Sequence, residues 1–272
     1  MKKTILAAAL CASLLAPFAN AQVEAKIRIL ANEQERSGKL RWMPSISQYS
    51  FTYKLQNNAA AEAEARYSPS DINILQVTPP ETARTLFQQA EAKNEAAIPG
   101  LTKIMEDYKM LDWDTRAAER IAFIYNSKGR FADTVKLGDK LTTDNSSAPT
   151  TSTFAPRYWE ALVATGKSGG GKLDGWLEEA IASAPRSVAA SALIARGDML
   201  EKEKNYKKAL TDGYLRAALM FRNEKEPNAE ALYKAALTFD KIGQIAYAEK
   251  MRQMLVDNHR TSPWTRKAQG GN

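Results

Sequence analysis

Short alternating runs of apolar and polar residues characterise the first part of the chain. In the run from Tyr49 to Leu55, apolar side chains occupy every second position and polar ones stand between them. Alternation with a period of two predicts β-strands that are buried on one face. We therefore predict a small antiparallel β domain over residues 22–78, with about four strands. The alanine-rich run at 59–65 is open to a second interpretation, a helical insert.

From Pro79 onward the apolar residues follow a different period. They recur every three or four positions as far as Trp264, and this spacing predicts amphipathic helices. The pair Pro79-Pro80 marks the junction, since proline interrupts regular elements. We predict a mostly α-helical chain, with a helical domain over 79–268 after the β domain and a flexible tail over 269–272.

The helical part contains a spacing that recurs. Counting from Ala229, Ala236 is eighth, Phe239 eleventh, Gly243 fifteenth and Ala248 twentieth. Small residues at positions eight and twenty let two antiparallel helices approach closely, while the aromatic residue fills the space beside them. The glycine supplies the left-handed turn that reverses the chain. These positions resemble the tetratricopeptide repeat, a helix-turn-helix unit of 34 residues.

Two further segments, counted from Thr115 and from Ala190, carry parts of the same pattern. Thr134 replaces the alanine at position twenty of the first segment, and Lys204 replaces the glycine at position fifteen of the second. The residues that match are Ala122, Tyr125 and Gly129 in the first segment, and Gly197, Tyr206 and Ala209 in the second.

The resemblance implies an irregular tetratricopeptide-like α-solenoid, in which helix pairs stack because no pair can bury its apolar face alone. In such repeats the first helix of each unit lines a concave face through positions two, five, nine and twelve, which share one stripe. The residues there suit an extended peptide segment. Two alternatives remain: an irregular helical bundle, and a row in which several of these positions pack against neighbouring units or the β domain. The implied contact residues are Arg116, Glu119, Phe123, Asn126, Ile194, Asp198, Glu201, Glu230, Tyr233, Leu237 and Asp240.

The first residues carry the features of an export signal. Lys2 and Lys3 precede a short apolar run that Pro17 interrupts, and the sequence ANA at 19–21 has the small-x-small pattern that signal peptidase recognises. We predict a cleaved signal peptide over 1–21 and a mature chain in the periplasm or outer envelope. A retained amphipathic anchor is the alternative. No later run reaches the ~18 apolar residues that a membrane span needs.

Composition narrows the available chemistry. The chain has 38 Lys and Arg residues against 31 Asp and Glu, a formal net charge of +7. Because no run of like charges stands out and an exported chain rarely meets nucleic acid, we expect no nucleic-acid partner. Cys11, the only cysteine, lies in the predicted signal, and His259 is the only histidine. We therefore expect no cofactor and no metal site, and we expect His259 to cap a helix C-terminus as a cation.

One segment is similar to a phosphate-binding loop. The sequence GKSGGGK at 166–172 fits its opening, but Leu173 replaces the Ser or Thr hydroxyl that would hold Mg²⁺. The residues before it have a helical pattern, whereas the loop of nucleotide-binding proteins follows a buried strand. We therefore expect a linker between two helices.

These features predict an exported, non-enzymatic scaffold or adaptor that binds a protein or peptide partner, and they leave its oligomeric state open. Two other functions have candidate residues. Trp113, Trp159 or Trp176 would stack on sugar rings in an envelope polysaccharide-binding or carbohydrate-active protein, provided that they are exposed. Asp112 and Asp114 would serve a hydrolase if they converged in a cleft.

Overall fold

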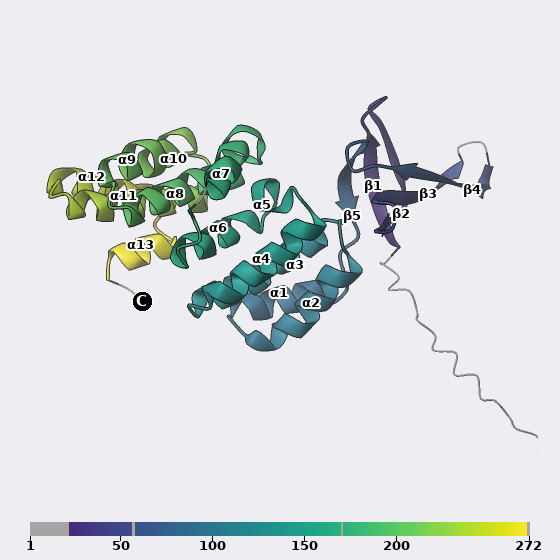
Figure 1. The fold of residues 1–272 in the computed structure, drawn as a ribbon, viewed down its shortest axis with the longest axis horizontal. Helices are drawn as coiled ribbons and strands as arrows, with labels where there is room; N and C mark the ends of the chain where they lie inside the picture. The colour runs from purple at the N-terminus through teal and green to yellow at the C-terminus, as the bar shows by residue number, and fades with distance from the viewer. Residues whose placement is uncertain (1–21, 56–57, 170, 271–272) are drawn as a thin grey trace, which may run out of the picture. The chain divides into compact units, whose positions relative to one another are not determined.

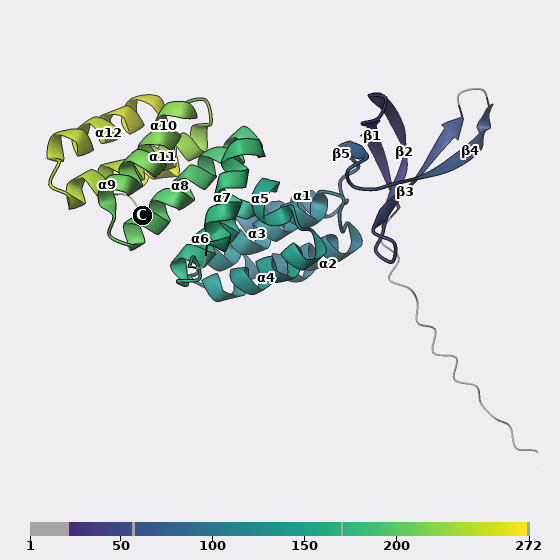
Figure 2. The ribbon, with the colours of Figure 1, turned by 45° about the horizontal axis from the view of Figure 1, so that its top comes forward.

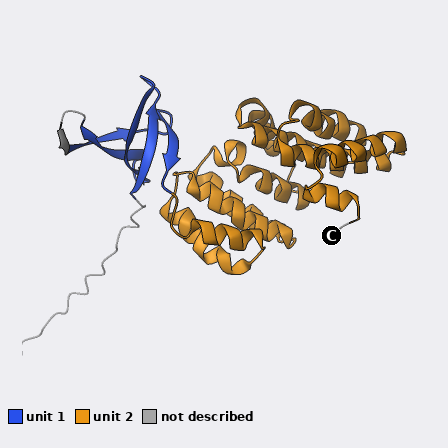
Figure 3. Ribbon diagram, turned by 180° about the vertical axis from the view of Figure 1, so that it is seen from behind, with its two compact units in different colours: residues 1–78 blue, residues 79–272 orange. Residues whose placement is uncertain are grey.

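Two compact units make up the structure, a computed structural model that describes residues 22–55, 58–169 and 171–270. The first unit ends at Thr78 and the second begins at Pro79 (Figure 3). The described strands all lie in the first unit and the described helices in the second (Figure 1). The predicted signal peptide, residues 1–21, and the last two residues of the predicted tail lie outside the described residues.

A five-stranded antiparallel sheet with the order β4-β3-β2-β1-β5 forms the first unit. The predicted antiparallel β domain is thus confirmed, with one strand more than expected. The run at 59–65 lies in β4, so the helical interpretation was wrong, because cross-strand pairing with β3 outweighs the helical preference of alanine and glutamate. The strands are β1 Val23–Ile29, β2 Gln34–Met43, β3 Gln48–Leu55, β4 Asn58–Tyr67 and β5 Ile72–Val77.

One face of the sheet holds the core of this unit. Side chains at every second position of β1 are buried, as the alternation predicts. On the same face, Leu40 and Phe51 are fully buried and lie opposite each other in the β2–β3 ladder. Trp42 and Tyr49, the next pair on this face, meet edge to face with ring centroids 4.9 Å apart. Cross-strand pairs of large side chains therefore fix the register.

The second unit consists of helices joined by short turns. Most follow one another as antiparallel pairs, and Figures 1 and 2 show α3 beside α4 and α11 beside α12. The elements are α1 Ala83–Glu91, η1 Glu95–Ala97, α2 Ile98–Asp107, α3 Trp113–Ser127, α4 Phe131–Asp144, α5 Ala148–Thr151, α6 Ala155–Ala164, α7 Lys172–Ser183, α8 Arg186–Lys202, α9 Tyr206–Lys208, η2 Ala209–Tyr214, α10 Leu215–Met220, α11 Lys225–Lys241, α12 Ile245–Asn258 and α13 Pro263–Ala268.

Five helices, α1, α3, α6, α8 and α11, end in the same turn. In each, a residue with positive φ follows the helix and donates its N–H to the carbonyl three residues back. The next residue donates to the carbonyl five residues before it, at 2.8–3.0 Å. This is the Schellman motif, which satisfies the last carbonyls of a helix. The residues with positive φ are Lys93, Gly129, Gly166, Lys204 and Gly243.

The core of the helical unit is a chain of three overlapping clusters. The first lies among α1, α2 and α3, the second among α3 to α8, and the third among α8 to α13. Helix α8 contributes to two of them from different sides, with Ala192 and Ala195 in one and Ala189 and Leu193 in the other. A helix with apolar residues on two sides needs neighbours on both. The unit is therefore held together by contacts between successive helix pairs.

Most small residues at the repeat positions are buried or lie in turns. Ala122, Ala209 and Ala248 are fully buried, and Ala236 is nearly so. Gly129 and Gly243 have φ of 73° and 72° in the turns. The aromatic positions lie beside those turns: Tyr125 lies under the guanidinium of Arg130, Phe239 stacks on Tyr247, and Tyr206 begins α9.

The pair formed by α8 and the segment after it departs from the pattern. The second helix of this pair is interrupted by a π-helical turn, η2. Gly197 therefore approaches Gly213 rather than Ala209, and a Cβ placed on Gly213 would lie 2.5 Å from the Cα of Gly197. The ring of Tyr214 occupies the space where a side chain of Gly197 would be. The inserted residue of a π-turn shifts the face that meets the partner helix, and the sequence pattern does not show it.

Replacing Ala248 with Leu should destabilise the helical unit by about 1–3 kcal/mol, because the site between α11 and α12 has no room for three more carbons. Thermal or urea unfolding measures the change. The matched control is Ala246→Leu, at an exposed position of the same helix. Equal stability of the Ala248 variant and the control would contradict the close packing of this pair.

Replacing Lys204 with Gly should stabilise the chain by about 1 kcal/mol, because Lys204 holds a φ of 61° that glycine adopts without steric cost. The reciprocal change, Gly243→Ala at the equivalent turn, should destabilise it by a similar amount. Both differences are read from equilibrium unfolding. A loss of stability in the Lys204 variant would show that its side chain has a role beyond the turn.

Candidate binding surface

The predicted contact residues lie on α3, α8 and α11, which α6 joins into one series. Helix α3 packs against α6, α6 against α8, and α8 against α11. We call the predicted residues on these helices the first-helix row. Three features decide what the row can bind: which side chains are exposed, which are paired with a neighbouring helix, and which are part of the core.

The α3 part of the row is directed at α6. Glu119 forms an ion pair with Arg157 at 3.4 Å, and the guanidinium of Arg157 lies 5.0 Å from the ring centroid of Phe123. Asn126 is buried and donates to the carboxylate of Glu160 and to the backbone carbonyl of Arg157, both at 3.0 Å. These three side chains therefore hold α3 and α6 together. The guanidinium of Arg157 contacts two of them, Glu119 and Phe123.

The α8 part of the row is directed at α11. Asp198 accepts a hydrogen bond from the Lys234 ammonium at 2.7 Å, and Glu201 accepts one from the Thr238 hydroxyl at 2.6 Å. Glu201 also pairs with Lys241. The side chains of Asp198 and Lys234 are both only 22% exposed, so this contact is shielded from water. Charged side chains in such a place are stable only when each has its partner.

Lys234 is the centre of this contact. It bridges two carboxylates, since it also donates to Glu230, one turn before it in α11, at 2.8 Å. Burial acts to lower the pKa of Lys234, but the negative charges of Asp198 and Glu230 outweigh that effect and raise the pKa above its ordinary value. The ammonium therefore stays charged over the physiological range and holds both carboxylates in place.

The remaining members of the row differ in exposure. Leu237 is 41% exposed. Arg116 is exposed and pairs with Asp112, the N-cap residue of its own helix. The other three are covered or paired: Ile194 is buried in the core, Tyr233 packs on the ring of Trp264 at 5.4 Å, and Asp240 pairs with Arg252 of α12.

The structure therefore divides the predicted contact residues. Arg116 and Leu237 offer a side chain to solvent without bonding to a neighbouring helix. Ile194 does not reach the surface, because its side of α8 faces α11 and η2. Most of the others are already bonded to α6, α11, α12 or α13, which is the arrangement that the packing alternative describes.

Sequence reasoning missed a pair of tyrosines that lie over glycines. The ring of Tyr158 fills the space beside Gly138, and its hydroxyl donates to Asp139 at 2.5 Å. Tyr214 stands in the same relation to Gly197 and to the carboxylate of Asp198, at 2.8 Å. Burial raises the pKa of both phenols, so they remain protonated donors. The dipeptide Gly-Asp at 138–139 and at 197–198 is the signal that could have pointed to them.

The tryptophans are not free platforms for sugar rings. Trp159 is fully buried, and its indole N–H donates to the carbonyl of Pro149 at 2.8 Å. Trp113 is half-buried against Phe87 and under the guanidinium of Arg116. Trp176 is half-buried too, with Tyr158 at 5.7 Å and Lys172 over its ring. Each ring thus has its faces or edges in contact with protein.

Asp112 and Asp114 face different surroundings. Asp112 is exposed and bonds to Arg116 at 2.7 Å. Asp114 is 2% exposed, and its two oxygens accept the backbone N–H groups of Met110 and Thr115 at 2.8 and 2.9 Å. The burial of Asp114 raises its pKa to about 6. Asp114 lies in the first turn of α3 and satisfies backbone donors from there.

His259 follows α12 and bonds to a side chain of another helix. Its Nε2 lies 2.8 Å from the Oδ1 of Asn228, while the Nδ2 of Asn228 donates to the carbonyl of Ala218. Burial lowers the pKa of His259, which favours the neutral ring. His259 is the C-cap residue of α12, as expected, but the lowered pKa favours a neutral ring over the expected cation, and the imidazole donates to the amide oxygen of Asn228 in α11.

The glycine-rich segment connects two helices. Helix α6 precedes it, Gly166 forms the helix-ending turn, and Gly171 stands at the start of α7. Over the described part of the chain, no three His, Cys, Asp or Glu side chains gather as a metal-binding group. In the same residues no helix is both long and apolar enough to span a bilayer.

Comparison of the chain with protein-family models, with curated proteins and with solved structures finds no match. The likeness to the tetratricopeptide repeat therefore depends on the residues quoted above and on the geometry of the helix pairs.

The buried carboxyl of Asp114 should make stability depend on pH. Because its folded pKa is about 6 and its ordinary value is 3.8, the folded state binds the proton more tightly than the unfolded chain. This group should therefore favour folding below about pH 4, and its contribution should fall by about 3 kcal/mol as the pH rises to 6. Urea unfolding of the wild type and of Asp114→Asn between pH 4 and 7 measures the difference in slope.

The control for this experiment is Glu106→Gln, which removes an exposed carboxylate from α2. Its pH profile should match that of the wild type, whereas the profile of Asp114→Asn should be flatter. Parallel profiles for all three proteins would contradict a raised pKa at Asp114.

Proposed function

We propose that this chain is an exported, non-enzymatic scaffold or adaptor of the cell envelope, built as an irregular tetratricopeptide-like solenoid that binds a segment of a protein partner. The observation that carries the proposal is the turn shared by α1, α3, α6, α8 and α11. A helix-turn-helix geometry that recurs five times in one unit is what a repeat protein requires. Export rests on the signal-like residues 1–21.

The packing of the helices supports the same proposal. Each first helix contacts the next first helix in the series, and it also contacts the second helix of the pair before it. Stacking of this kind places first helices side by side and gives them a common face. The short last helix, α13, packs against both α11 and α12 and covers Tyr233 with Trp264. Capping elements of this kind close the end of a solenoid.

The cross-helix ion pairs limit where a partner segment binds. Lys234 satisfies Asp198, and Thr238 and Lys241 satisfy Glu201, so a ligand would have to break those bonds to use either carboxylate. The accessible contacts on the row are Leu237, with its apolar side chain, and Arg116 at the other end of the series. We therefore place the partner segment over the exposed edges of α3 and α11, with an apolar residue at Leu237 as an anchor.

A photo-crosslinking amino acid at position 237, introduced into the full-length protein in intact cells, tests this proposal. A discrete adduct with a protein is expected at 237. The matched control is the same substitution at Leu219, which is 56% exposed but lies on α10, outside the row. The variant Leu237→Glu should weaken recovery of the partner, while Leu219→Glu should leave it unchanged.

Three results would contradict the proposal. Adducts of the same pattern at 237 and 219 would indicate non-specific contact, and recovery of polysaccharide alone would favour a sugar-binding role. The N-terminal residue of the same purified protein tests export. Cleavage of the proposed signal would make Gln22 the first residue. A chain that retains residues 1–21 and stays outside the envelope fraction would exclude the proposed compartment.

A further inference from the structure

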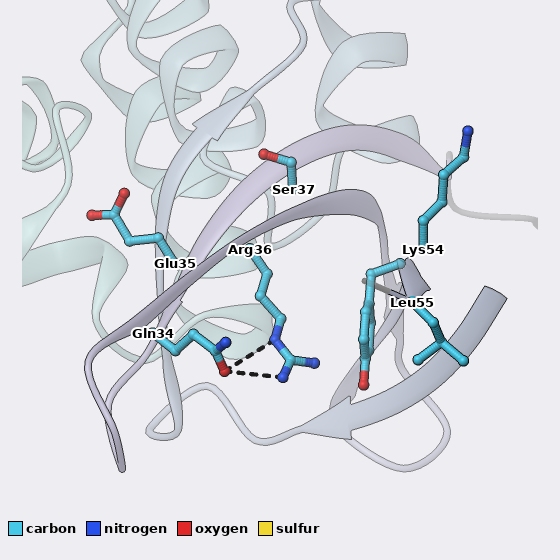
Figure 4. Close-up of a pocket in the computed structure, with 7 residues that line it drawn as sticks. Gln34, Glu35, Arg36, Ser37, Lys54 and Leu55 are labelled. Atoms are coloured by element: carbon cyan, nitrogen blue, oxygen red, sulfur yellow. Dashed lines mark hydrogen bonds between the residues drawn. The ribbon is translucent and has the colours of Figure 1, made fainter. Parts of the chain in front are cut away.

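The sheet of the first unit opens into a pocket between β2 and β3. The two strands are paired from Met43–Gln48 to Lys39–Thr52. Beyond that point the first half of β2 remains on β1, and the second half of β3 remains on β4. The divergence leaves a pocket of about 470 Å³, a size that suits a small ligand. Its lining residues are Gln34, Glu35, Arg36, Ser37, Tyr53, Lys54 and Leu55 (Figure 4).

The point of divergence is built into the sequence. A Cβ on Gly38 would lie 2.9 Å from the ring of Phe51 and would meet the carbonyl of Thr52. Only glycine lets the fully buried Phe51 ring lie against β2 at this point. The divergence of β2 and β3 beyond this point is therefore a fixed feature of the sheet.

Arg36 occupies a position where the strand pattern calls for an apolar residue. Along β2 the side chains of Gln34, Arg36, Gly38, Leu40 and Trp42 share one face by alternation. Leu40 and Trp42 are buried on that face, whereas Arg36 and Gln34 are half-buried. A charged side chain on the core side of a sheet costs free energy, and such departures from pattern are expected at functional sites.

The guanidinium of Arg36 is held in one orientation. Its Cζ lies 4.4 Å from the ring centroid of Tyr53, and its Nε and Nη2 both donate to the Oε1 of Gln34, at 3.3 and 2.9 Å. Figure 4 shows the side chains of Gln34 and Arg36 pointing toward each other, with the two hydrogen bonds between them. Two of the five N–H groups are used, so the Nη1 and Nη2 end keeps donors for a ligand. The guanidinium is therefore already oriented before a ligand binds.

Arg36 has no carboxylate within ion-pair distance among the described residues. Glu35, its neighbour in β2, points away from it in Figure 4 and is bound to Lys26 at 2.6 Å and Arg28 at 2.7 Å. Lys54 also points away from Arg36. The pocket therefore contains one oriented positive charge that the protein does not neutralise.

We propose that this pocket binds a small ligand through a single carboxylate, which takes the free Nη1 and Nη2 end of Arg36 in a bidentate pair. A planar carboxylate matches the planar fork of a guanidinium. Lys54, the other cation in the lining, points away from Arg36, so the oriented charge is that of one guanidinium, which matches one negative charge better than the two of a phosphate monoester. Leu55, 41% exposed at the rim, provides an apolar wall for the part of the ligand next to the carboxylate. The site is separate from the first-helix row and does not depend on the scaffold function.

Calorimetric titration of the full mature chain at constant ionic strength tests this inference. The probes are sodium hexanoate, in which the carboxylate is on an apolar chain, and sodium glucuronate, in which it belongs to a sugar acid. Hexanamide is the uncharged analogue of the first. Saturable binding of at least one carboxylate, with none of the amide, is the expected result. The probe that binds identifies the source of the carboxylate.

Variants of β2 locate the site. Arg36→Gln should weaken carboxylate binding by about tenfold or more, and Arg36→Lys should weaken it less, since a lysine keeps the charge without the fork. The matched control is Arg41→Gln, which removes the same charge from an exposed position on the opposite face of β2. It should leave binding unchanged.

Any of three results would overturn the inference. These are no saturation with either carboxylate, equal binding of hexanamide and hexanoate, and equal weakening by the Arg41 and Arg36 variants. The comparison of hexanoate with hexanamide uses the wild-type protein alone. A folding defect in a variant would therefore not prevent a decision.

Discussion

Helix α8 has to bury apolar side chains on two sides at once, and the helical unit depends on meeting that requirement. One side supplies Ala192 and Ala195 to the cluster shared with α6 and α7, and another supplies Leu193 and Ile194 to the cluster shared with α11. Helix α3 has the same property between α1–α2 and α4–α6. A helix of this kind has no stable place at a surface, so helix pairs must be added on both sides of it.

The polar contacts between first helices follow from that stacking. Once α3, α6, α8 and α11 lie in series, the side chains between them are partly withdrawn from water and need partners. Arg157 meets Glu119, and Lys234 meets Asp198 and Glu230, because each charge is only partly hydrated there. These pairs set the positions of neighbouring helices. They also leave a smaller surface for a ligand than a row of free side chains would offer.

The two units differ in how their half-buried charged side chains are paired. In the helical unit the half-buried charges are matched within the protein, and Lys234 alone bridges two carboxylates. In the sheet Arg36 is oriented by Gln34 and Tyr53 but is matched by no acidic side chain among the described residues. A half-buried charge that has its partner within the protein is satisfied by the fold, whereas an oriented and unmatched charge is prepared for an external partner. This contrast distinguishes a structural contact from a binding site in the same chain.

The sequence by itself determined the local elements and the positions that need a particular residue. Alternation from Tyr49 to Leu55 predicts a strand, and glycine at 129 and 243 predicts the turns where φ is positive, because these effects act over a few neighbouring residues. Only the tertiary structure decided that residues 59–65 form a strand, that η2 shifts Gly197 onto Gly213, and that the predicted contact residues mostly bond to other helices. Each of these depends on partners far away in the chain, and a local pattern contains no information about which partner a side chain meets.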